Sequence, residues 1–392
     1  MKYVFDRPAP PRIGIEAAKW DMLPPGCGKD IVPLSVADME FLSPPEIVSA
    51  LEETARFGMW GYTGWGDRYY NALHKWMLER HSWEIQRDWL VQVNGVVQGL
   101  FAAVRAFTKP GDSIVIQPPV YFPFYRAVEE NGRVLVKNPL KLVDGRYEMD
   151  FDDLADKLAR PEVTAIILCS PHNPVGRVWT EEELRRVGDL CLANDVLVIC
   201  DEIHHDLIHT GHVHTVYAAL GEEYARNCVI GSACSKTFSL AGLACANMLV
   251  PDPEKKAVLE AEVHRSGCTT HSTFGVKALE VGYEQCGEWL DQMLDYVHGN
   301  YEYLKAFLGE HFPDMWVAPL EGTYLAWVKM SSLMADPQAR MEFLHNEAKL
   351  WLTHGGPFGD PDFERINLAC ARSVLEEALN RLLAAAKKHQ LL

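Results

Sequence analysis

The chain is predicted to be an α/β protein with a mostly parallel sheet in a large domain and a smaller α+β domain. Between residues 90 and 250, short apolar runs alternate with segments of helical periodicity, which indicates a parallel sheet covered by helices on both faces. Residues 272–312 contain few helix breakers and predict long helical structure that leaves the sheet domain. Strand-like segments at 316–319, 322–328 and 365–369 predict the sheet of the smaller domain.

Length and composition describe a globular protein of two domains. With 392 residues the chain is too long for one simple core, and 48% hydrophobic with 23% charged residues is typical of globular proteins. The net charge of −17 disfavours binding to nucleic acid and other polyanions. No apolar stretch is long enough to span a bilayer, and residues 1–7 lack the apolar region of a signal peptide. We therefore expect a cytoplasmic protein that binds neither nucleic acid nor a membrane.

The ten cysteines are scattered along the chain without a C-x-x-C pair, and several lie in apolar runs. Such thiols behave as small hydrophobic side chains, so we expect them to be reduced and mostly buried, with neither disulfides nor zinc sites. They are Cys27, Cys169, Cys191, Cys200, Cys228, Cys234, Cys245, Cys268, Cys286 and Cys370.

The N-terminal part predicts an irregular segment followed by two helices. Residues 1–45 are rich in Pro and Gly and are expected to join the smaller domain. Two prolines suit the first turn of a helix over residues 46–57. A glycine- and aromatic-rich loop, 58–66, then precedes a helix at 67–81.

The alternating part of the chain supplies seven predicted strands: Trp89–Val93, Ser113–Gln117, Arg133–Val136, Val163–Cys169, Val196–Cys200, Cys228–Gly231 and Cys245–Val250. The helices predicted between them are Val96–Phe107, Tyr121–Glu130, Phe151–Leu158 and Thr180–Asn194. The last of these begins with a capping box formed by Thr180 and Glu183. Active sites on such sheets form at the carboxyl ends of the strands, so the residues that follow the strands are the candidates for chemistry.

The C-terminal part is predicted to end in a helix that begins at Ser373, with Glu376 completing a second capping box. We divide the chain into an N-terminal segment (1–45), a large domain (46–285) and a small domain (286–392).

A lysine between two predicted buried strands is the most unusual feature of the sequence. Lys236 stands among small and hydroxyl residues between the apolar runs at 228–231 and 245–250. Taking an unpaired ammonium out of water is costly, although a lysine in such a loop is ordinarily a surface residue. Other segments supply what an aldehyde cofactor bound to a lysine needs. We therefore hypothesise that Lys236 forms a Schiff base with pyridoxal phosphate.

A phosphate-binding site is predicted where Gly95, Val96 and Val97 follow a strand and open a helix. Free N–H groups at the start of a helix favour a phosphate, although many glycines precede helices only as part of a turn. Ser235, next to the lysine, adds a hydroxyl.

Three further strand ends offer partners for the ring of such a cofactor. Asp201 ends a buried strand, where a carboxylate is costly unless it is paired, and it would keep a pyridine nitrogen protonated. Tyr121 offers a ring for stacking, and Asn173 offers a donor for the phenolate oxygen. Taken alone, the tyrosine suggests core packing and the asparagine a turn.

Taken together, these segments resemble the fold type I pyridoxal-phosphate enzymes, the aspartate aminotransferase superfamily. The matching motifs are Gly95-Val-Val97, Val120-Tyr-x-Pro-Phe124, Ser170-Pro-His-Asn-Pro-x-Gly-Arg-Val-Trp179, Asp201-Glu-Ile-His204 and Ser235-Lys-Thr-Phe238. Val32–Glu40, Gly61–Gly64, Glu321–Leu325 and Glu364–Ala369 narrow the resemblance to the MalY/PatB branch of C–S β-lyases, which includes cystathionine β-lyases and cystalysin. The resemblance covers nearly the whole chain and implies an aspartate-aminotransferase-like fold and a homodimer with active sites at its interface.

The resemblance also implies roles for individual residues. Lys236 and Tyr121 would be catalytic, the lysine as anchor and proton shuttle and the tyrosine as the stacking ring. Arg365 would hold the substrate α-carboxylate in a bidentate pair, with Ala37 beside it. Tyr62 would reach across the dimer interface to the partner's cofactor. The residues that would bind the cofactor within one chain are Gly95, Val96, Val97, Tyr121, Asn173, Asp201, His204, Ser235 and Lys236.

The implied activity is α,β-elimination from cystathionine or another cysteine S-conjugate, which yields pyruvate, ammonia and a thiol. An aminotransferase of an aromatic or neutral amino acid shares every residue above and is the alternative. A protein of this fold that only binds partners would not need Lys236, Asp201 and Arg365 together.

Two positions depart from the pattern of the family. Phe122 follows the stacking tyrosine where the family often has a second tyrosine. Residues 243–247 offer no clear match to the basic residue that the superfamily has after the lysine loop, which leaves the predicted phosphate site one charge poorer.

A histidine-rich run, His204–His214, suggests a different class of function, because five histidines in eleven residues could form a zinc-binding or regulatory module. The spacings do not fit a helical H-x-x-x-H face except from His205 to His209. We therefore predict a polar loop over the active site, with His204 near the cofactor and no metal.

Overall fold

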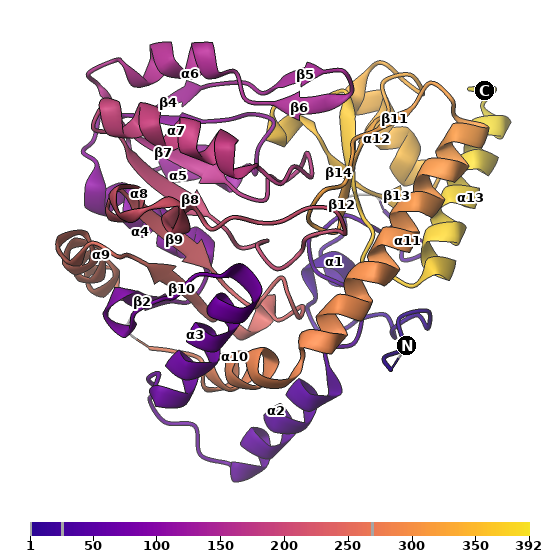
Figure 1. Ribbon diagram of the computed structural model, residues 1–392. Helices are drawn as coiled ribbons and strands as arrows, with labels where there is room; N and C mark the ends of the chain where they lie inside the picture. Colours follow the sequence, from indigo (N-terminus) through magenta and orange to yellow (C-terminus); the bar gives the residue numbers. More distant parts are fainter. Residues whose placement is uncertain (1, 25–26, 268–269) are drawn as a thin grey trace.

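The computed structural model describes residues 2–24, 27–267 and 270–392 and contains a large α/β domain beside a smaller domain (Figure 1). A 25-residue helix, α11 (Gly287–His311), runs along the smaller domain and leads away from the large one. The predicted fold class is confirmed by this arrangement. The residue numbers at which we divide the domains stay a prediction.

The large domain is built on a seven-stranded sheet with the order β2-β10-β9-β8-β7-β3-β4. The strands are β2 (Leu90–Val93), β3 (Ser113–Ile116), β4 (Val134–Lys137), β7 (Val163–Cys169), β8 (Leu197–Asp201), β9 (Cys228–Ser232) and β10 (Ala246–Leu249). β10 is antiparallel to both of its neighbours, and the other adjacent strands are parallel. The sheet is therefore mostly parallel, and each predicted strand is present within one or two residues of its expected bounds.

Alternate residues of the sheet bury two separate apolar clusters, as expected for a sheet covered on both faces. On β8, Leu197 and Ile199 enter one cluster, whereas Val198 and Cys200 enter the other. The first cluster is covered by α4 (Val96–Phe107), α5 (Pro123–Glu129) and α9 (Pro253–Arg265). The second is covered by α2 (Pro45–Phe57), α3 (Asp67–His81), α6 (Phe151–Leu158), α7 (Glu181–Ala193), α8 (Glu222–Arg226) and α10 (Thr273–Gln285).

The smaller domain is built on an antiparallel four-stranded sheet with the order β11-β12-β15-β14. Its elements are β11 (Trp316–Val317), β12 (Leu325–Lys329), β14 (Thr353–His354), β15 (Phe363–Asn367), α12 (Pro337–Asn346) and α13 (Arg372–Lys388). The N-terminal segment joins this domain, because β1 (Val32–Pro33) pairs in parallel with β13 (Leu350–Trp351). This pairing brings residues 34–40 across to the edge of the large sheet.

Several short elements have no counterpart in the sequence predictions. They are α1 (Ala18–Asp21), the hairpin of β5 (Lys141–Val143) and β6 (Arg146–Glu148), α8, β13, β14, and the 3-10 turns Arg87–Trp89, Tyr217–Leu220, Ala241–Leu243 and Gly356–Phe358. All are too short to show a helical or alternating pattern in the sequence.

One predicted capping box is present and the other is wrong. At the start of α7, Glu183 N donates to Thr180 Oγ1 (3.2 Å) and Thr180 N donates to Glu183 Oε2 (2.8 Å). The last helix begins at Arg372 rather than at Ser373, and no side chain of its own caps it. Its first N–H instead donates to the hydroxyl of Tyr296 on α11 (2.8 Å), so a tertiary contact replaces the predicted box.

The cysteines follow the expected pattern where the structure describes them. Eight are buried, Cys27 is half-buried, and these nine are unpaired; Cys268 lies outside the described residues. Within the same described part of the chain, no helix combines the length and apolarity needed to cross a bilayer.

Gly355 provides a test of packing in the smaller domain. A Cβ at this position would lie 2.2 Å from the carbonyl oxygen of Asp360 and 2.5 Å from that of Phe363, which are backbone atoms that cannot rotate away. We expect Gly355→Ala to lower the free energy of unfolding by about 1–3 kcal/mol, measured by chemical denaturation. Gly309→Ala is the control, because a Cβ there meets nothing within 4 Å on an exposed position of α11. Equal stability of the two variants would contradict the packing described here.

Candidate active site

A small enclosed pocket lies where the parallel strands of the large sheet end. It is lined by Ala37, Val96, Val97, Tyr121, Cys169, Asn173, Asp201, Ile203, His204 and Lys236. All of these except Cys169 and Ile203 are residues that the sequence predicts for the site. The strands β7 and β8 end next to each other, which explains why residues 169–173 and 201–204 meet here.

Lys236 lies in the turns that follow β9, with its ammonium group turned toward the N-terminal segment. Lys236 Nζ donates a hydrogen bond to the carbonyl oxygen of Ala37 at 2.5 Å. Burial, together with the positive charge of Arg365, lowers the pKa of Lys236 to about 8. A useful fraction of the lysine is therefore a neutral amine near neutral pH, which suits a nucleophile or a base.

Asp201 ends β8 inside the pocket and is buried. Its Oδ1 accepts a hydrogen bond from the backbone N–H of Ile203 at 3.1 Å. Burial raises the pKa of Asp201 to about 7, although Lys236 acts in the opposite direction. A cationic group opposite this carboxylate would stabilise its ionised form.

Arg365, on β15 of the smaller domain, does not line the pocket itself but contacts Asn173, which does, and so connects the two domains. Its Nη1 donates to Asn173 Oδ1 at 2.9 Å, and its Nη2 lies 3.5 Å from the carbonyl oxygen of Ser35 and 3.4 Å from Thr353 Oγ1. Burial lowers the pKa of Arg365 to about 10, and its Nε has no hydrogen-bond partner. Because Asn173 Oδ1 accepts a hydrogen bond from the arginine, Asn173 Nδ2 remains as a donor for a group in the pocket.

The start of α4 forms the other end of the site. Gly95 is the N-cap residue in an extended conformation, and no side chain caps this 12-residue helix. A Cβ on Gly95 would meet nothing within 4 Å, so this N-cap residue is not closely packed. Ser235, half-buried, lies beside Lys236 in the sequence. This combination is suited to an anion such as a phosphate.

The three aromatic residues considered for the site differ in their surroundings. Tyr121 lines the pocket, and burial raises the pKa of its phenol. Phe122 lies against Phe358 in an edge-to-face contact (5.7 Å between ring centroids) and is exposed. Tyr62 is 98% exposed and is absent from the pocket lining, so the structure does not bring it to the other predicted residues of the same chain.

The histidine-rich run is a loop, as predicted, but four of its five histidines, His204, His205, His209 and His214, are buried. His209 Nε2 bonds to the carbonyl oxygen of Thr323 (2.8 Å), and His214 Nε2 bonds to Glu202 Oε2 (3.0 Å). The run therefore packs beneath the pocket and ties it to the smaller domain. The prediction for His204 itself agrees with its place in the pocket lining.

Sequence reasoning missed three residues of the site. Cys169 and Ile203 line the pocket, and the hydroxyl of Tyr324 donates to Ala37 O at 2.9 Å, on the same oxygen that Lys236 uses. Cys169 ends a predicted strand, Ile203 lies inside the Asp-Glu-Ile-His motif, and Tyr324 lies in Glu321–Leu325. All three residues lie in segments that the sequence analysis identified. Apolar and aromatic residues in such segments are common in protein cores, so nothing in the sequence marked these three as part of the site.

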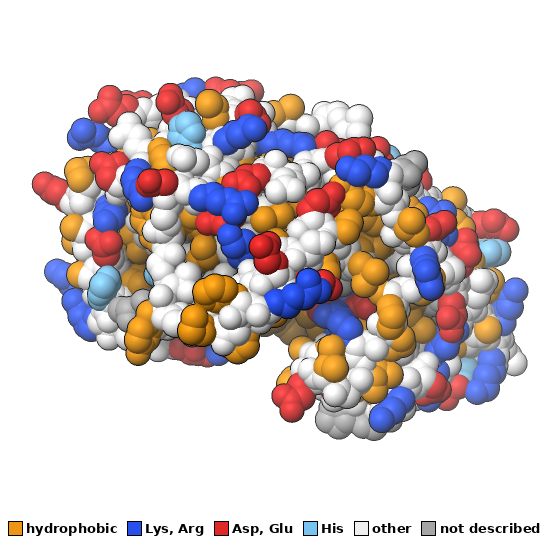
Figure 2. Space-filling view, turned by 90° about the horizontal axis from the view of Figure 1, so that it is seen from below, with side chains coloured by type: hydrophobic (Ala, Val, Ile, Leu, Met, Phe, Trp, Pro, Cys, Tyr) orange, Lys and Arg blue, Asp and Glu red, His pale blue; other side chains and the backbone are white. Residues whose placement is uncertain are grey.

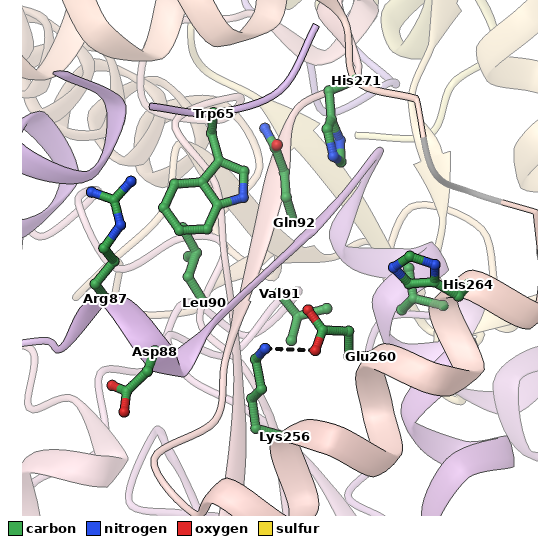
Figure 3. Close-up of a pocket in the computed structure, with 11 residues that line it drawn as sticks. Trp65, Arg87, Asp88, Leu90, Val91, Gln92, Lys256, Glu260, His264 and His271 are labelled. Atoms are coloured by element: carbon green, nitrogen blue, oxygen red, sulfur yellow. Dashed lines mark hydrogen bonds and ion pairs between the residues drawn. The ribbon is translucent and has the colours of Figure 1, made fainter. Parts of the chain in front are cut away.

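A larger hollow lies elsewhere, between β2, α9 and the loop that holds Trp65, with a volume of about 570 Å³ (Figure 3). Figure 3 shows the Trp65 ring between Arg87 and Gln92, and Lys256 pairs with Glu260 at 2.6 Å. None of the residues predicted for the site lines this hollow. The candidate chemistry is therefore in the smaller pocket around Lys236.

The residues around Lys236 fit pyridoxal phosphate. Buried polar atoms without a protein partner, His204 Nδ1 and Arg365 Nε, border the site. An amine, a carboxylate at the end of a strand and an open helix N-terminus are the three groups that this cofactor requires, at Lys236, Asp201 and Gly95.

The sequence matches the profile of the Aminotransferase class I and II family over residues 29–382, so the chain belongs to this family. It is 40% identical over 379 residues to cystathionine beta-lyase PatB of Bacillus subtilis (strain 168), covering 95% of this chain and 97% of that protein. Cystalysin from Treponema denticola, whose crystal structure contains pyridoxal 5'-phosphate, is similar in structure with a TM-score of 0.96, 38% identity and coverage of 99% and 100%. The pyridoxal-phosphate-bound C–S lyase from Staphylococcus hominis gives a TM-score of 0.91, 30% identity and coverage of 98% and 99%.

The raised pKa of Asp201 predicts a specific pH dependence of stability in the cofactor-free protein. Between pH 3.8 and about 7 the folded chain keeps a proton on Asp201 that the unfolded chain has lost, so stability falls as pH rises through this window. Asp201→Asn removes this effect. We expect the variant to gain up to about 4 kcal/mol relative to wild type at pH 8 compared with pH 4, measured by chemical denaturation.

Asp314→Asn is the control for this measurement, because it removes an exposed carboxylate outside the site. If Asp314→Asn and Asp201→Asn change the pH profile equally, the buried carboxylate has no special environment.

Proposed function

We propose that this chain is a pyridoxal-phosphate-dependent C–S β-lyase. It cleaves cystathionine or another cysteine S-conjugate to pyruvate, ammonia and a thiol by α,β-elimination. The observation that carries the proposal is the placement of a lysine of lowered pKa and a buried arginine, Lys236 and Arg365, around one pocket. The lyase names of the relatives favour elimination over transamination, for which the same residues would serve.

Each part of the pocket has a role toward the cofactor. Lys236 would carry it, and Asp201 would hold the proton of the pyridine nitrogen. Asn173 Nδ2 would donate to the phenolate oxygen, and the N–H groups that follow Gly95 would bind the phosphate. When bound, the cofactor supplies an electron-accepting ring that stabilises negative charge on the substrate Cα.

Arg365 orients the substrate through its α-carboxylate. A guanidinium forms two parallel hydrogen bonds to a carboxylate, and the unpartnered Nε of Arg365 gives it a free donor for this purpose. The bond from Arg365 Nη1 to Asn173 holds the plane of the guanidinium beside the pocket. The substrate would thereby be fixed at one end, which would orient its Cα–H bond relative to the lysine.

Lys236 acts as the base at Cα. Its pKa of about 8 lies close to neutral pH, which favours both the removal and the return of a proton. The carbonyl of Ala37 accepts from Lys236 Nζ and fixes the direction of the amine when it is not bonded to the cofactor. The thiolate then leaves from Cβ without the need for a second amino-group acceptor.

The two enzyme activities are separated by a simple assay. Incubation with cystathionine should release pyruvate and a thiol without an added keto acid, and Lys236→Ala should reduce the rate by at least about 1,000-fold, because it removes both anchor and base. Pyruvate is measured by coupled reduction and the thiol by a colour reagent. Activity that depends wholly on an added keto acid would instead establish the aminotransferase. Lys305→Ala, on an exposed position of α11, is the control.

We also propose a homodimer in which Tyr62 completes the partner's site. Phe57, Met59, Trp60 and Tyr62 are between 57% and 98% exposed, which is unusual for adjacent large side chains in a monomer. A hollow of about 900 Å³ lies beside them between α2 and α10. Figure 2 views the molecule from this side and shows hydrophobic side chains among charged ones on that face. This surface is suited to a second copy of the chain.

The shared site is tested by mixing two inactive variants, Tyr62→Ala and Lys236→Ala, under conditions that exchange subunits. A hybrid dimer has one site with an intact lysine and an intact tyrosine from the partner, so mixing should restore roughly a quarter of wild-type activity. If Tyr62 serves its own chain, every site of the hybrid lacks one residue and no activity returns. Light scattering on each variant checks that both remain dimers.

A cytoplasmic location is proposed for the protein. The cysteines that the structure describes are unpaired, and eight of them are buried, which suits a reducing compartment. Disulfides in protein purified without reductant would contradict this location.

A further inference from the structure

A buried carboxylate outside the pocket holds the segment that carries Lys236. Thr237, the next residue, is fully buried, and its hydroxyl donates to Asp206 Oδ2 at 2.6 Å. Neither residue lines the pocket. We propose that Asp206, acting through Thr237, is a positioning residue that sets where the amine of Lys236 stands over the substrate. The proposal rests on the role of Lys236 in the function proposed above.

The carboxylate is anchored on its other side by helix α3. Asp206 Oδ1 accepts hydrogen bonds from Trp76 Nε1 at 2.8 Å and from His81 Nε2 at 2.7 Å. The Trp76 ring is stacked on Tyr283 of α10 (4.7 Å, 18°), which fixes the position of this donor. Asp206 is therefore a fixed acceptor, and Thr237 is the group that is held by it.

The surroundings of Asp206 favour its ionised form. Burial disfavours the carboxylate, but His205, His81 and the hydrogen bond from Thr237 together hold the pKa of Asp206 well below its usual range. An ionised acceptor forms a shorter and stronger hydrogen bond than a neutral one. The bond to Thr237 is thus stronger than an ordinary hydroxyl contact.

The lysine segment needs such a contact because it is neither helix nor strand. Residues 234–239 form consecutive turns, in which Phe238 N donates to Cys234 O (3.1 Å) and Leu240 N donates to Ser235 O (2.8 Å). Adjacent Cα atoms are about 3.8 Å apart, so a displacement of Thr237 is passed on to Lys236. An error of 1 Å in the position of a catalytic group lowers a rate by about 100-fold.

The same residues could also be considered as a metal site, since ligand atoms of His81, His205 and Asp206 lie within 4.8 Å of one another. The hydrogen bonds favour a different interpretation. Asp206 Oδ1 is already bonded to both His81 Nε2 and Trp76 Nε1, and Asp206 Oδ2 accepts from Thr237. A metal ion would have to displace the bond from His81, whereas the network as it stands satisfies both carboxylate oxygens.

The test compares Thr237→Val, which removes the hydroxyl and keeps the branched shape, with Thr237→Ser, which keeps the hydroxyl. In the holoenzyme we expect Thr237→Val to lower kcat by about 100-fold with KM within about twofold, and Thr237→Ser to recover most of the loss. A second measurement needs no turnover. The visible absorbance of the bound cofactor changes with pH as the nitrogen that joins it to Lys236 gains or loses a proton. The midpoint of this pH titration should move by about one pH unit in Thr237→Val and should have the wild-type value in Thr237→Ser.

Two further variants make the result decisive. Asp206→Asn keeps the volume and removes the charge, and it should shift kcat and the absorbance midpoint in the same direction as Thr237→Val. Thr164→Val is the matched control, because it removes another hydroxyl–carboxylate bond, to Asp112 Oδ2 (3.3 Å), on β7. It should leave both readouts at the wild-type value.

The proposal is overturned if Thr237→Val lowers the melting temperature but keeps both kcat and the absorbance midpoint, since the contact would then be structural alone. It is also overturned if the wild type contains about one zinc per chain that Asp206→Asn loses. If no thioether yields pyruvate while the midpoint still shifts in Thr237→Val and returns in Thr237→Ser, the lyase assignment fails and the positioning role stands.

Discussion

The site depends on holding two cations out of water within one site of the molecule. Among the described residues, no carboxylate pairs directly with Lys236 or Arg365; the lysine donates to a backbone carbonyl, and the arginine donates to the amide of Asn173. Burial lowers the pKa of each cation, and the neutral dipoles that they contact supply no compensating charge. Two buried cations in one site favour the binding of anionic groups such as a substrate carboxylate or a phosphate.

Three parts of the chain that are far apart in sequence supply the groups of this site. The large sheet supplies Asp201 and the turns with Lys236, the smaller domain supplies Arg365, and the N-terminal segment supplies the carbonyl of Ala37. The pairing of β1 with β13 brings the third part to the other two. Beneath them, Asp206 connects the lysine turns to α3, so the pocket is supported from the core as well as from the domain boundary.

The elements with strong local signals were predictable from the sequence. Apolar runs predicted the strands of the large sheet, and the Thr180 capping box predicted the start of α7. Asp201 and Asn173 were predicted for the site because they stand at the ends of predicted strands. Predictions failed where a distant residue decides the local structure: Tyr296 holds the start of α13, and the burial of His209 depends on a carbonyl in the smaller domain. Backbone acceptors such as Ala37 O have no sequence signal at all, because every residue carries one.

The carbonyl of Ala37 has a consequence for the enzyme's acid–base behaviour. It accepts from Lys236 of the large domain and from Tyr324 of the smaller one, and its segment is attached to the smaller domain through β1. An opening that carried Ala37 with the smaller domain would break the bond from Met39 N to Ser239 Oγ and take this acceptor away from the ammonium. Proton affinity at Lys236 and closure of the domains are then linked equilibria, and each must favour the other to the same extent.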